Sequence, residues 1–180
     1  FTFTVTRDNT DEAFSLAVNT NNVTANNSDL TPISGGTVNF TTGGSLTATV
    51  SVTVNADDIV ELNETFEVVL SGAPYGIIFT KATGLGTITN DDQAVLSINS
   101  VTNSEGNSGT QIYSFTITSD KAVDVPFTVN AATANVTALA GSDYVSNSGV
   151  ISFTGIAGET HTFNVTVNGD VLVETTEAFN

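Results

Sequence analysis

The chain has 180 residues, of which 12% are charged, and its 19 acidic residues against 3 basic ones give a formal net charge of −16. Three cations are too few to displace the counterions of a nucleic acid or to hold a chain on an anionic membrane, so both kinds of partner are excluded. The absence of cysteine excludes disulfides, thiolate zinc sites and cysteine nucleophiles.

Alternation of apolar and polar residues predicts β-strands from the first residue onward. Residues 1–6 alternate Phe and Val with Thr, and residues 47–55 alternate Val and Ala with Thr, Ser and Asn. A period of two in such residues is typical of half-buried strands. Two further strands are predicted at about 63–71 and 77–89. Because residue 1 lies inside an alternating run, we expect this sequence to be a processed or excised piece of a longer chain.

The second half of the chain continues the same pattern. The strands predicted there are at about 94–100, 111–119, 122–131, 149–154 and 160–168, with another starting near 177. Glycine-containing breakers such as 43–44 and 157–158 separate the runs. No stretch shows helical periodicity over three turns, and no apolar run approaches the roughly 18 residues of a membrane-spanning helix.

Three sequence blocks occur twice, in the same order and about 113 residues apart. The pairs are 1–8 (FTFTVTRD) with 113–120 (YSFTITSD), 27–30 (NSDL) with 141–144 (GSDY), and 54–66 (VNADDIVELNETF) with 167–179 (VNGDVLVETTEAF). A period of this length is the size of one ordinary domain. We therefore predict two domains, a repeat at 1–92 that lacks its first strand and a repeat at 93–180 that lacks its last strand.

About seven strands in a complete repeat of this length predict a particular fold class. It is all-β, an immunoglobulin-like antiparallel β-sandwich present as tandem repeats. The cysteine pair and tryptophan of true immunoglobulin domains are absent.

The acidic residues gather at matching places in both repeats. In repeat one they are Asp29, Asp57, Asp58, Glu61, Glu64, Asp91 and Asp92, and in repeat two Glu105, Asp143, Asp170, Glu174 and Glu177. Loops at one end of a sandwich can converge, and carboxylates gathered there repel one another without a counter-ion. Ca²⁺ accepts six to eight oxygens from flexible loops, whereas Mg²⁺ demands a strict octahedron. The pattern therefore predicts a Ca²⁺ site, and a solvated acidic surface is the alternative.

Four blocks resemble the Calx-β family, namely GSDY, VNGDVLVETTEAF, VNADDIVELNETFEVVLS and GTITNDD. The resemblance covers essentially the whole chain, and its most specific element is the acidic stretch that leads into E-x-F. It implies seven-stranded sandwiches that bind Ca²⁺ through loops at one end. The ligands implied for the first repeat are Asp29, Asp57, the carbonyl of Ile59, Glu61, Glu64, Asp91 and Asp92. Those implied for the second repeat are Glu105, Asp143, Asp170, the carbonyl of Leu172, Glu174 and Glu177.

Two positions depart from the family pattern. The best calcium-binding members carry an additional Asp where this chain has Ala56 and Gly169. Because fewer carboxylates bind Ca²⁺ less tightly, we expect an affinity nearer the extracellular range of about 10⁻⁴–10⁻³ M than that of a cytosolic sensor.

An enzymatic function is not expected. His161 is the only histidine, no nucleophile or phosphate-loop motif is present, and we interpret His161 as an incidental surface residue. Carboxylate pairs such as Asp57 with Glu61, or Asp170 with Glu174, could in principle cleave glycosides. A sugar cleft also needs aromatic platforms, and the chain has no Trp and only 3 Tyr.

These observations favour a structural or adhesive calcium-binding module of an extracellular or cell-surface fibre or matrix protein. We expect Ca²⁺ to stiffen the junction between repeats, neighbouring repeats of the same protein to be the partners, and no insertion into a membrane. The alternatives are a calcium-sensing regulatory module and a carbohydrate-binding appendage of a larger enzyme. An incomplete repeat also has an open sheet edge, which predicts strand exchange with other copies unless the ends are merely trimmed.

Overall fold

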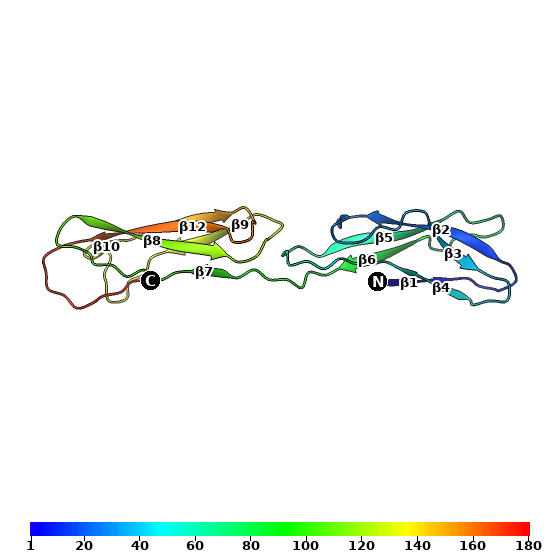
Figure 1. Cartoon of the computed structure of the whole chain (residues 1–180), viewed down its shortest axis with the longest axis horizontal. Helices are drawn as coiled ribbons and strands as arrows, with labels where there is room; N and C mark the ends of the chain where they lie inside the picture. Colours follow the sequence, from blue (N-terminus) through cyan, green and yellow to red (C-terminus); the bar gives the residue numbers. More distant parts are fainter. The chain divides into compact units, whose positions relative to one another are not determined.

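The computed structural model describes residues 1–180, which form two compact units. The first comprises Phe1–Asp57 and Leu62–Asp91, and the second comprises Asp58–Glu61 and Asp92–Asn180. Each unit consists of antiparallel β-strands (Figure 1), which confirms the predicted all-β sandwich fold. The structure contains no helix capable of crossing a membrane.

The first unit has six strands in two sheets (Figure 1). They are β1 (Thr2–Thr6), β2 (Phe14–Asn22), β3 (Gly36–Phe40), β4 (Thr47–Ser51), β5 (Glu64–Ser71) and β6 (Thr83–Ile88). One sheet has the order β3-β2-β5-β6, and the other pairs β1 with β4. Strand β5 therefore lies inside its sheet, between β2 and β6.

The core of the first unit forms because alternate residues of both sheets point inward. Phe66 on β5 is fully buried, and Val18 on β2 and Val50 on β4 are buried with it in one cluster. The rings of Phe1 and Phe3 meet Phe66 edge-on, at centroid distances of 5.5 and 5.9 Å. Truncating a buried Phe of this kind to Ala costs about 3–5 kcal/mol, so β5 anchors this sandwich.

Arg7, one of the three basic residues, binds backbone carbonyl oxygens rather than carboxylates. Its guanidinium donates hydrogen bonds to the carbonyl oxygens of Ser45, Glu12 and Thr41 at 3.0, 2.9 and 2.7 Å, and it lies over the ring of Phe40. These contacts close the loops at one end of the first unit, because five N–H donors in a planar fork can serve several carbonyls at once.

The second unit has six strands as well. They are β7 (Leu96–Ile98), β8 (Thr110–Ser119), β9 (Phe127–Ala132), β10 (Tyr144–Val145), β11 (Ser148–Phe153) and β12 (Thr160–Asn168). One sheet has the order β10-β12-β8-β7, and the other pairs β11 with β9. The repeat in the sequence makes β8 and β12 the counterparts of β1 and β4, and β9 and β11 the counterparts of β2 and β3.

Several strands are shorter than the sequence pattern predicted. The strand expected at 122–131 begins at Phe127, directly after Pro126, which has no N–H to donate to a ladder. The strand expected at 94–100 covers only Leu96–Ile98, the three residues that pair with β8. The strand expected at 77–89 covers only Thr83–Ile88, and near residue 177 a single bridge at Phe179 forms. Strands β2 and β3 were not predicted separately, although their counterparts β9 and β11 were.

Candidate metal sites

The first acidic group consists of Asp29, Glu61 and Glu64. Each of the three offers a carboxylate oxygen, and these oxygens all lie within 4.8 Å of one another. Asp29 sits in the loop between β2 and β3, Glu64 is the first residue of β5, and Glu61 lies shortly before it. Three carboxylates at this spacing repel one another, and a cation among them would relieve the repulsion.

Asp29 is held in place by its own turn. Only 3% of the residue is exposed, and its Oδ2 accepts a hydrogen bond from the backbone N–H of Asn26 over 2.5 Å. Its other oxygen, Oδ1, is buried and has no hydrogen-bond partner. A buried carboxylate oxygen without a partner is costly unless a cation or a donor reaches it. The residues of this group therefore fit a hard cation such as Ca²⁺.

Asn55 clamps the turn that carries Asp29. Its backbone N–H donates to the carbonyl oxygen of Asp29 over 2.8 Å, and its side-chain Nδ2 donates to the carbonyl oxygen of Ser28 over 2.7 Å. Sequence reasoning missed this residue because it carries no charge. The signal was present in the repeated VN that precedes each acidic stretch, at residues 54–55 and 167–168.

The second acidic group consists of Asp143, Glu174 and Glu177, whose carboxylate oxygens also lie within 4.8 Å of one another. The turn of Asp143 repeats that of Asp29, since Oδ2 of Asp143 accepts from the backbone N–H of Leu139 over 2.6 Å. Asn168 corresponds to Asn55. Its backbone N–H donates to the carbonyl oxygen of Asp143 over 2.9 Å, and its side-chain Nδ2 donates to the carbonyl oxygen of Ser142 over 2.8 Å. The two units therefore build the same local frame around one aspartate each.

The electrostatics of the second group reflect crowding of negative charge. Desolvation, together with the charges of Asp170, Glu105 and Asp143, raises the pKa of Glu174. Desolvation also raises the pKa of Glu177, helped by a hydrogen bond with Asp143. The hydrogen bond from the Leu139 backbone holds the pKa of Asp143 below its ordinary value. Asp143 is thus the residue of this group that ionises most readily. A neighbouring cation would stabilise the ionised forms of the two glutamates most.

The structure places the remaining predicted ligands outside the two groups of three. Asp57 and Asp91 are exposed, and Ile59 is 37% exposed. Asp92 accepts a hydrogen bond from Lys121, with Nζ 2.8 Å from Oδ1, and Lys121 also reaches Asp58 at 3.3 Å. These hydrogen bonds, first from Asp92 and then from Asp58, raise the pKa of Lys121. One of the chain's few cations therefore neutralises part of the predicted ligand set.

Three of the ligands predicted for the second repeat, Glu105, Asp170 and Leu172, are not members of its acidic group. The charge of Glu105 acts on both Glu174 and Glu177, and Asp170 acts on Glu174. The carboxylate of Asp170 accepts from the backbone N–H of Leu172 over 2.7 Å, which fixes the local turn. Leu172 itself is 67% exposed.

Gly169 explains one departure from the expected acidic pattern. A Cβ at this position would lie 2.7 Å from the carbonyl oxygen of Glu105 and 2.8 Å from that of Gly106. Any side chain there requires the loop of Glu105 to move. The close backbone approach therefore keeps the additional carboxylate out of the second group.

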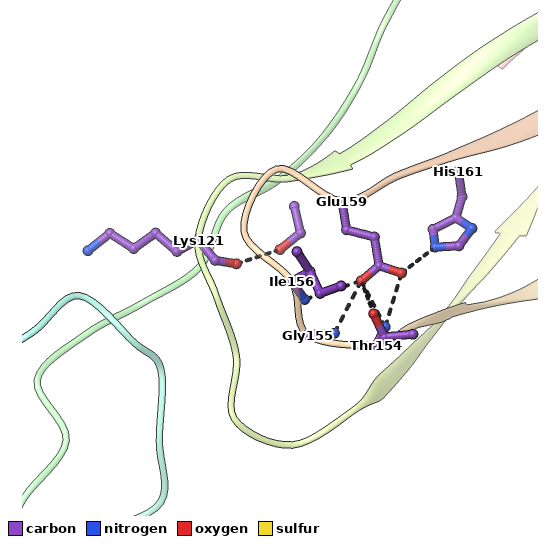
Figure 2. Close-up of polar contacts among 7 residues, drawn as sticks. Lys121, Thr154, Gly155, Ile156, Glu159 and His161 are labelled. Atoms are coloured by element: carbon purple, nitrogen blue, oxygen red, sulfur yellow. Dashed lines mark hydrogen bonds and ion pairs between the residues drawn. The ribbon is translucent and has the colours of Figure 1, made fainter. Parts of the chain in front are cut away.

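His161 lies away from both acidic groups, on β12. Its Nε2 is 2.8 Å from Oε1 of Glu159 (Figure 2). Its ring meets that of Phe153 edge-on, with the ring centroids 4.7 Å apart. Glu159 also accepts hydrogen bonds from the backbone and hydroxyl of Thr154 and from the backbone of Gly155. The histidine therefore belongs to a polar network that closes the turn between β11 and β12.

Comparison with known proteins gives a family for the whole chain. The signature of the Calx-beta domain matches residues 1–79 and 89–180. Two similar solved structures are the calcium binding domain CBD12 of CALX1.1 and CBD12 from CALX1.2, each with 18% sequence identity and a TM-score of 0.48. The first match covers 91% of this chain and 67% of that chain, and the second covers 99% and 71%. No curated protein matches the chain.

Proposed function

This chain belongs to the Calx-beta domain family, and from that membership together with its two acidic groups we propose that it is a non-catalytic module that binds Ca²⁺ at one site in each sequence repeat. The first site consists of Asp29, Glu61 and Glu64, and the second of Asp143, Glu174 and Glu177. The buried Oδ1 of Asp29, which has no hydrogen-bond partner, is the observation that carries this proposal. Ca²⁺ suits the donor set because it accepts carboxylates and carbonyls in an irregular shell, whereas Mg²⁺ requires a strict octahedron.

The two sites differ in strength. Asp29 is buried in a fixed turn, whereas Glu174 and Glu177 are exposed and lie outside the strands of the second unit. More ordering is therefore required before the second site can close around an ion, and this costs binding free energy. With three carboxylates each, both sites fall in the weak range of about 10⁻⁴–10⁻³ M, the first at its tighter end.

The biological role that follows is structural. We propose a spacer or adhesive domain pair of an extracellular or cell-surface protein, in which Ca²⁺ stiffens the connection between repeats. Support comes from the tandem repeat, the low content of charged residues, and the acids Asp91 and Asp92 in the short connection between β6 and β7. A weak site is filled where Ca²⁺ is millimolar and acts there as a permanent structural ion.

Isothermal titration calorimetry tests this function directly. We expect Ca²⁺ to bind two sites per chain, with dissociation constants of about 10⁻⁴–10⁻³ M, in a titration that equimolar Mg²⁺ does not abolish. Glu64→Gln should remove the tighter site and Glu177→Gln the weaker one. Submicromolar binding would instead support a calcium sensor, and the absence of binding would refute the calcium-dependent role.

A further inference from the structure

Asn55 and Asn168 clamp the two aspartate turns in the same way, but they differ in the residue that follows. Asn55 precedes Ala56, whereas Asn168 precedes Gly169 and is the only Asn in the chain that a Gly follows. Asparagine is a chemically labile residue, and a glycine after it favours the reaction because no Cβ hinders the approach of the glycine nitrogen to the asparagine side chain. The two clamps therefore share a geometry and differ in chemical stability.

Packing requires the glycine of this pair. A Cβ at Gly169 would lie 2.7 Å from the carbonyl oxygen of Glu105 and 2.8 Å from that of Gly106. Both oxygens belong to the backbone, so neither can move without a shift of the loop. Ala56 is exposed, and the first repeat has room for a side chain at the equivalent position. The second repeat thus retains a labile pair at the residue that clamps its turn.

The reaction of this pair, deamidation, requires no co-reactant other than water. The backbone nitrogen of Gly169 loses its proton and forms a bond to Cγ of Asn168, and the side-chain nitrogen of Asn168 leaves as ammonia. Water then opens the resulting cyclic imide at either of its carbonyl carbons. The product is aspartate, or isoaspartate, in which the main chain continues through the former side chain and is lengthened by one atom.

The folded structure holds every group that takes part in this reaction. Asn168 is the last residue of β12, and its backbone N–H and side-chain Nδ2 donate to the carbonyl oxygens of Asp143 and Ser142. The N–H of Gly169 donates to the carbonyl oxygen of Gly109 over 2.9 Å, which keeps the proton on the attacking nitrogen and fixes its direction. Attack on Cγ therefore requires these bonds to open, and the rate follows the population of the opened state.

Conversion of Asn168 removes the clamp. A carboxylate at this position has no hydrogen to donate, so the carbonyl oxygen of Ser142 loses its bond and faces a negatively charged oxygen instead. In the isoaspartate product the lengthened main chain also displaces the backbone N–H that bonds to Asp143. Both products thus destabilise the turn that Asn168 holds.

We propose that Asn168 is a deamidation site whose reaction is gated by local opening at the end of β12, and that its conversion releases the turn of Asp143. The first repeat has the same clamp without this site, because Ala56 follows Asn55. The reaction is a property of the chain itself and does not depend on Ca²⁺ binding.

Peptide mapping by mass spectrometry tests the modification site in the whole chain, incubated at neutral pH in EDTA with and without urea. In urea, aspartate and isoaspartate should form at Asn168 about tenfold or more faster than at Asn55. In the folded chain the reaction at Asn168 should be slower than in urea by about tenfold or more, and still faster than at Asn55. The variant Ala56→Gly should give Asn55 the rate of Asn168 in urea.

A second measurement tests the release of the turn. Asn168→Asp reproduces the aspartate product and should lower the urea midpoint of unfolding. Asn164→Asp is the matched control, because it makes the same change of charge at an exposed position of the same strand and should lower the midpoint less.

Three results would overturn the proposal. One is an equal rate of conversion at Asn168 and Asn55 in urea, and another is an equal rate at Asn168 with and without urea, since opening would then not control the reaction. The third is an equal midpoint for Asn168→Asp and Asn164→Asp. The rates at Asn168 and Asn55 are measured in the unsubstituted chain, so they test the site even if a variant fails to fold.

Discussion

The backbone N–H of Asn55 donates to the carbonyl oxygen of Asp29 over 2.8 Å, which ties the start of the acidic stretch to the turn that carries the buried ligand. The side chain of Asn55 adds a second bond, to the carbonyl oxygen of Ser28. The acidic residues that follow Asn55 in the sequence are thereby brought toward Asp29. An uncharged residue thus sets the geometry of the first site.

Removing this clamp should weaken calcium binding without removing a ligand. Asn55→Ala deletes one side-chain hydrogen bond, so we expect a loss of about 0.5–1.5 kcal/mol of stability and a lower Ca²⁺ affinity at the first site. Calorimetry and chemical denaturation measure the two effects. Asn39→Ala, on β3, is the matched control and should leave Ca²⁺ affinity unchanged. Equal Ca²⁺ affinities of Asn55→Ala and wild type would show that the turn keeps its conformation without the Asn55 side chain.

Charge removal at a ligand should abolish the stabilisation by Ca²⁺ at that site. Glu61→Gln keeps the shape of the side chain and removes one of three carboxylates, so we expect the calcium-induced rise in melting temperature from the first site to disappear. Glu67→Gln, on β5 and outside the acidic group, is the control that should behave as wild type. If both variants respond to Ca²⁺ alike, Glu61 is not a ligand.

Adding a carboxylate should have opposite results in the two units. Ala56 is exposed, so Ala56→Asp adds negative charge next to Asn55 and should tighten Ca²⁺ binding at the first site. Gly169→Asp forces the loop of Glu105 aside, because a Cβ there would lie 2.7 Å from a backbone oxygen, and should destabilise the second unit. Thermal unfolding in EDTA and calorimetry with Ca²⁺ compare the two variants. A stable Gly169→Asp variant with tighter binding would contradict the steric explanation.

Glu159 should make stability depend on pH in the acidic range. Desolvation opposes its ionisation, but hydrogen bonds from His161 and Thr154 outweigh it and lower the pKa of Glu159 from an ordinary 4.5 to about 2 (Figure 2). A lowered pKa in the folded state stabilises the protein above the unfolded-state pKa, and this contribution is lost as pH falls from 4.5 through about 2.

The variant Glu159→Gln should therefore be less stable than wild type at neutral pH, and the difference should shrink between pH 4.5 and about 2. Urea denaturation at several pH values measures it. Asp120→Asn, which alters another acidic residue of the second unit, serves as the comparison for general charge effects. A constant difference between Glu159→Gln and wild type over this range would mean that the network is not linked to ionisation.

The fold could be predicted from the sequence because alternation reports which strand faces are buried. The run at 160–168 matches β12 in full, since its Val and Phe residues alternate with Thr and Asn without a breaker. The strand predicted at 122–131 begins later, at Phe127, because Pro126 interrupts the hydrogen-bond ladder. Alternation of residue types does not capture this local effect. The order of the strands in each sheet depends on which strands pair, and the pattern of one strand does not contain that information.

The acidic groups could be predicted in part. The repeat indicated Asp29 and Asp143 because each lies in a matching block, and the structure puts each beside two glutamates. The sequence repeat could not show that Lys121 forms an ion pair with Asp92, because β7 and β8 separate the two residues in the sequence. Nor could it reveal the close approach at Gly169, since that depends on how a distant loop packs.

Thermal unfolding in Ca²⁺ against equimolar Mg²⁺ at constant ionic strength tests the central claim most directly. An ion that binds only the folded state stabilises it by RT ln(1 + [L]/Kd), about 1.4 kcal/mol per site at a tenfold excess over Kd and about 2.7 kcal/mol at a hundredfold excess. We predict a rise in melting temperature with Ca²⁺ that Mg²⁺ does not reproduce and that the double variant Glu61→Gln, Glu174→Gln lacks. An unchanged melting temperature, or an equal rise with Mg²⁺, would contradict the account and leave the acidic groups as solvated surface.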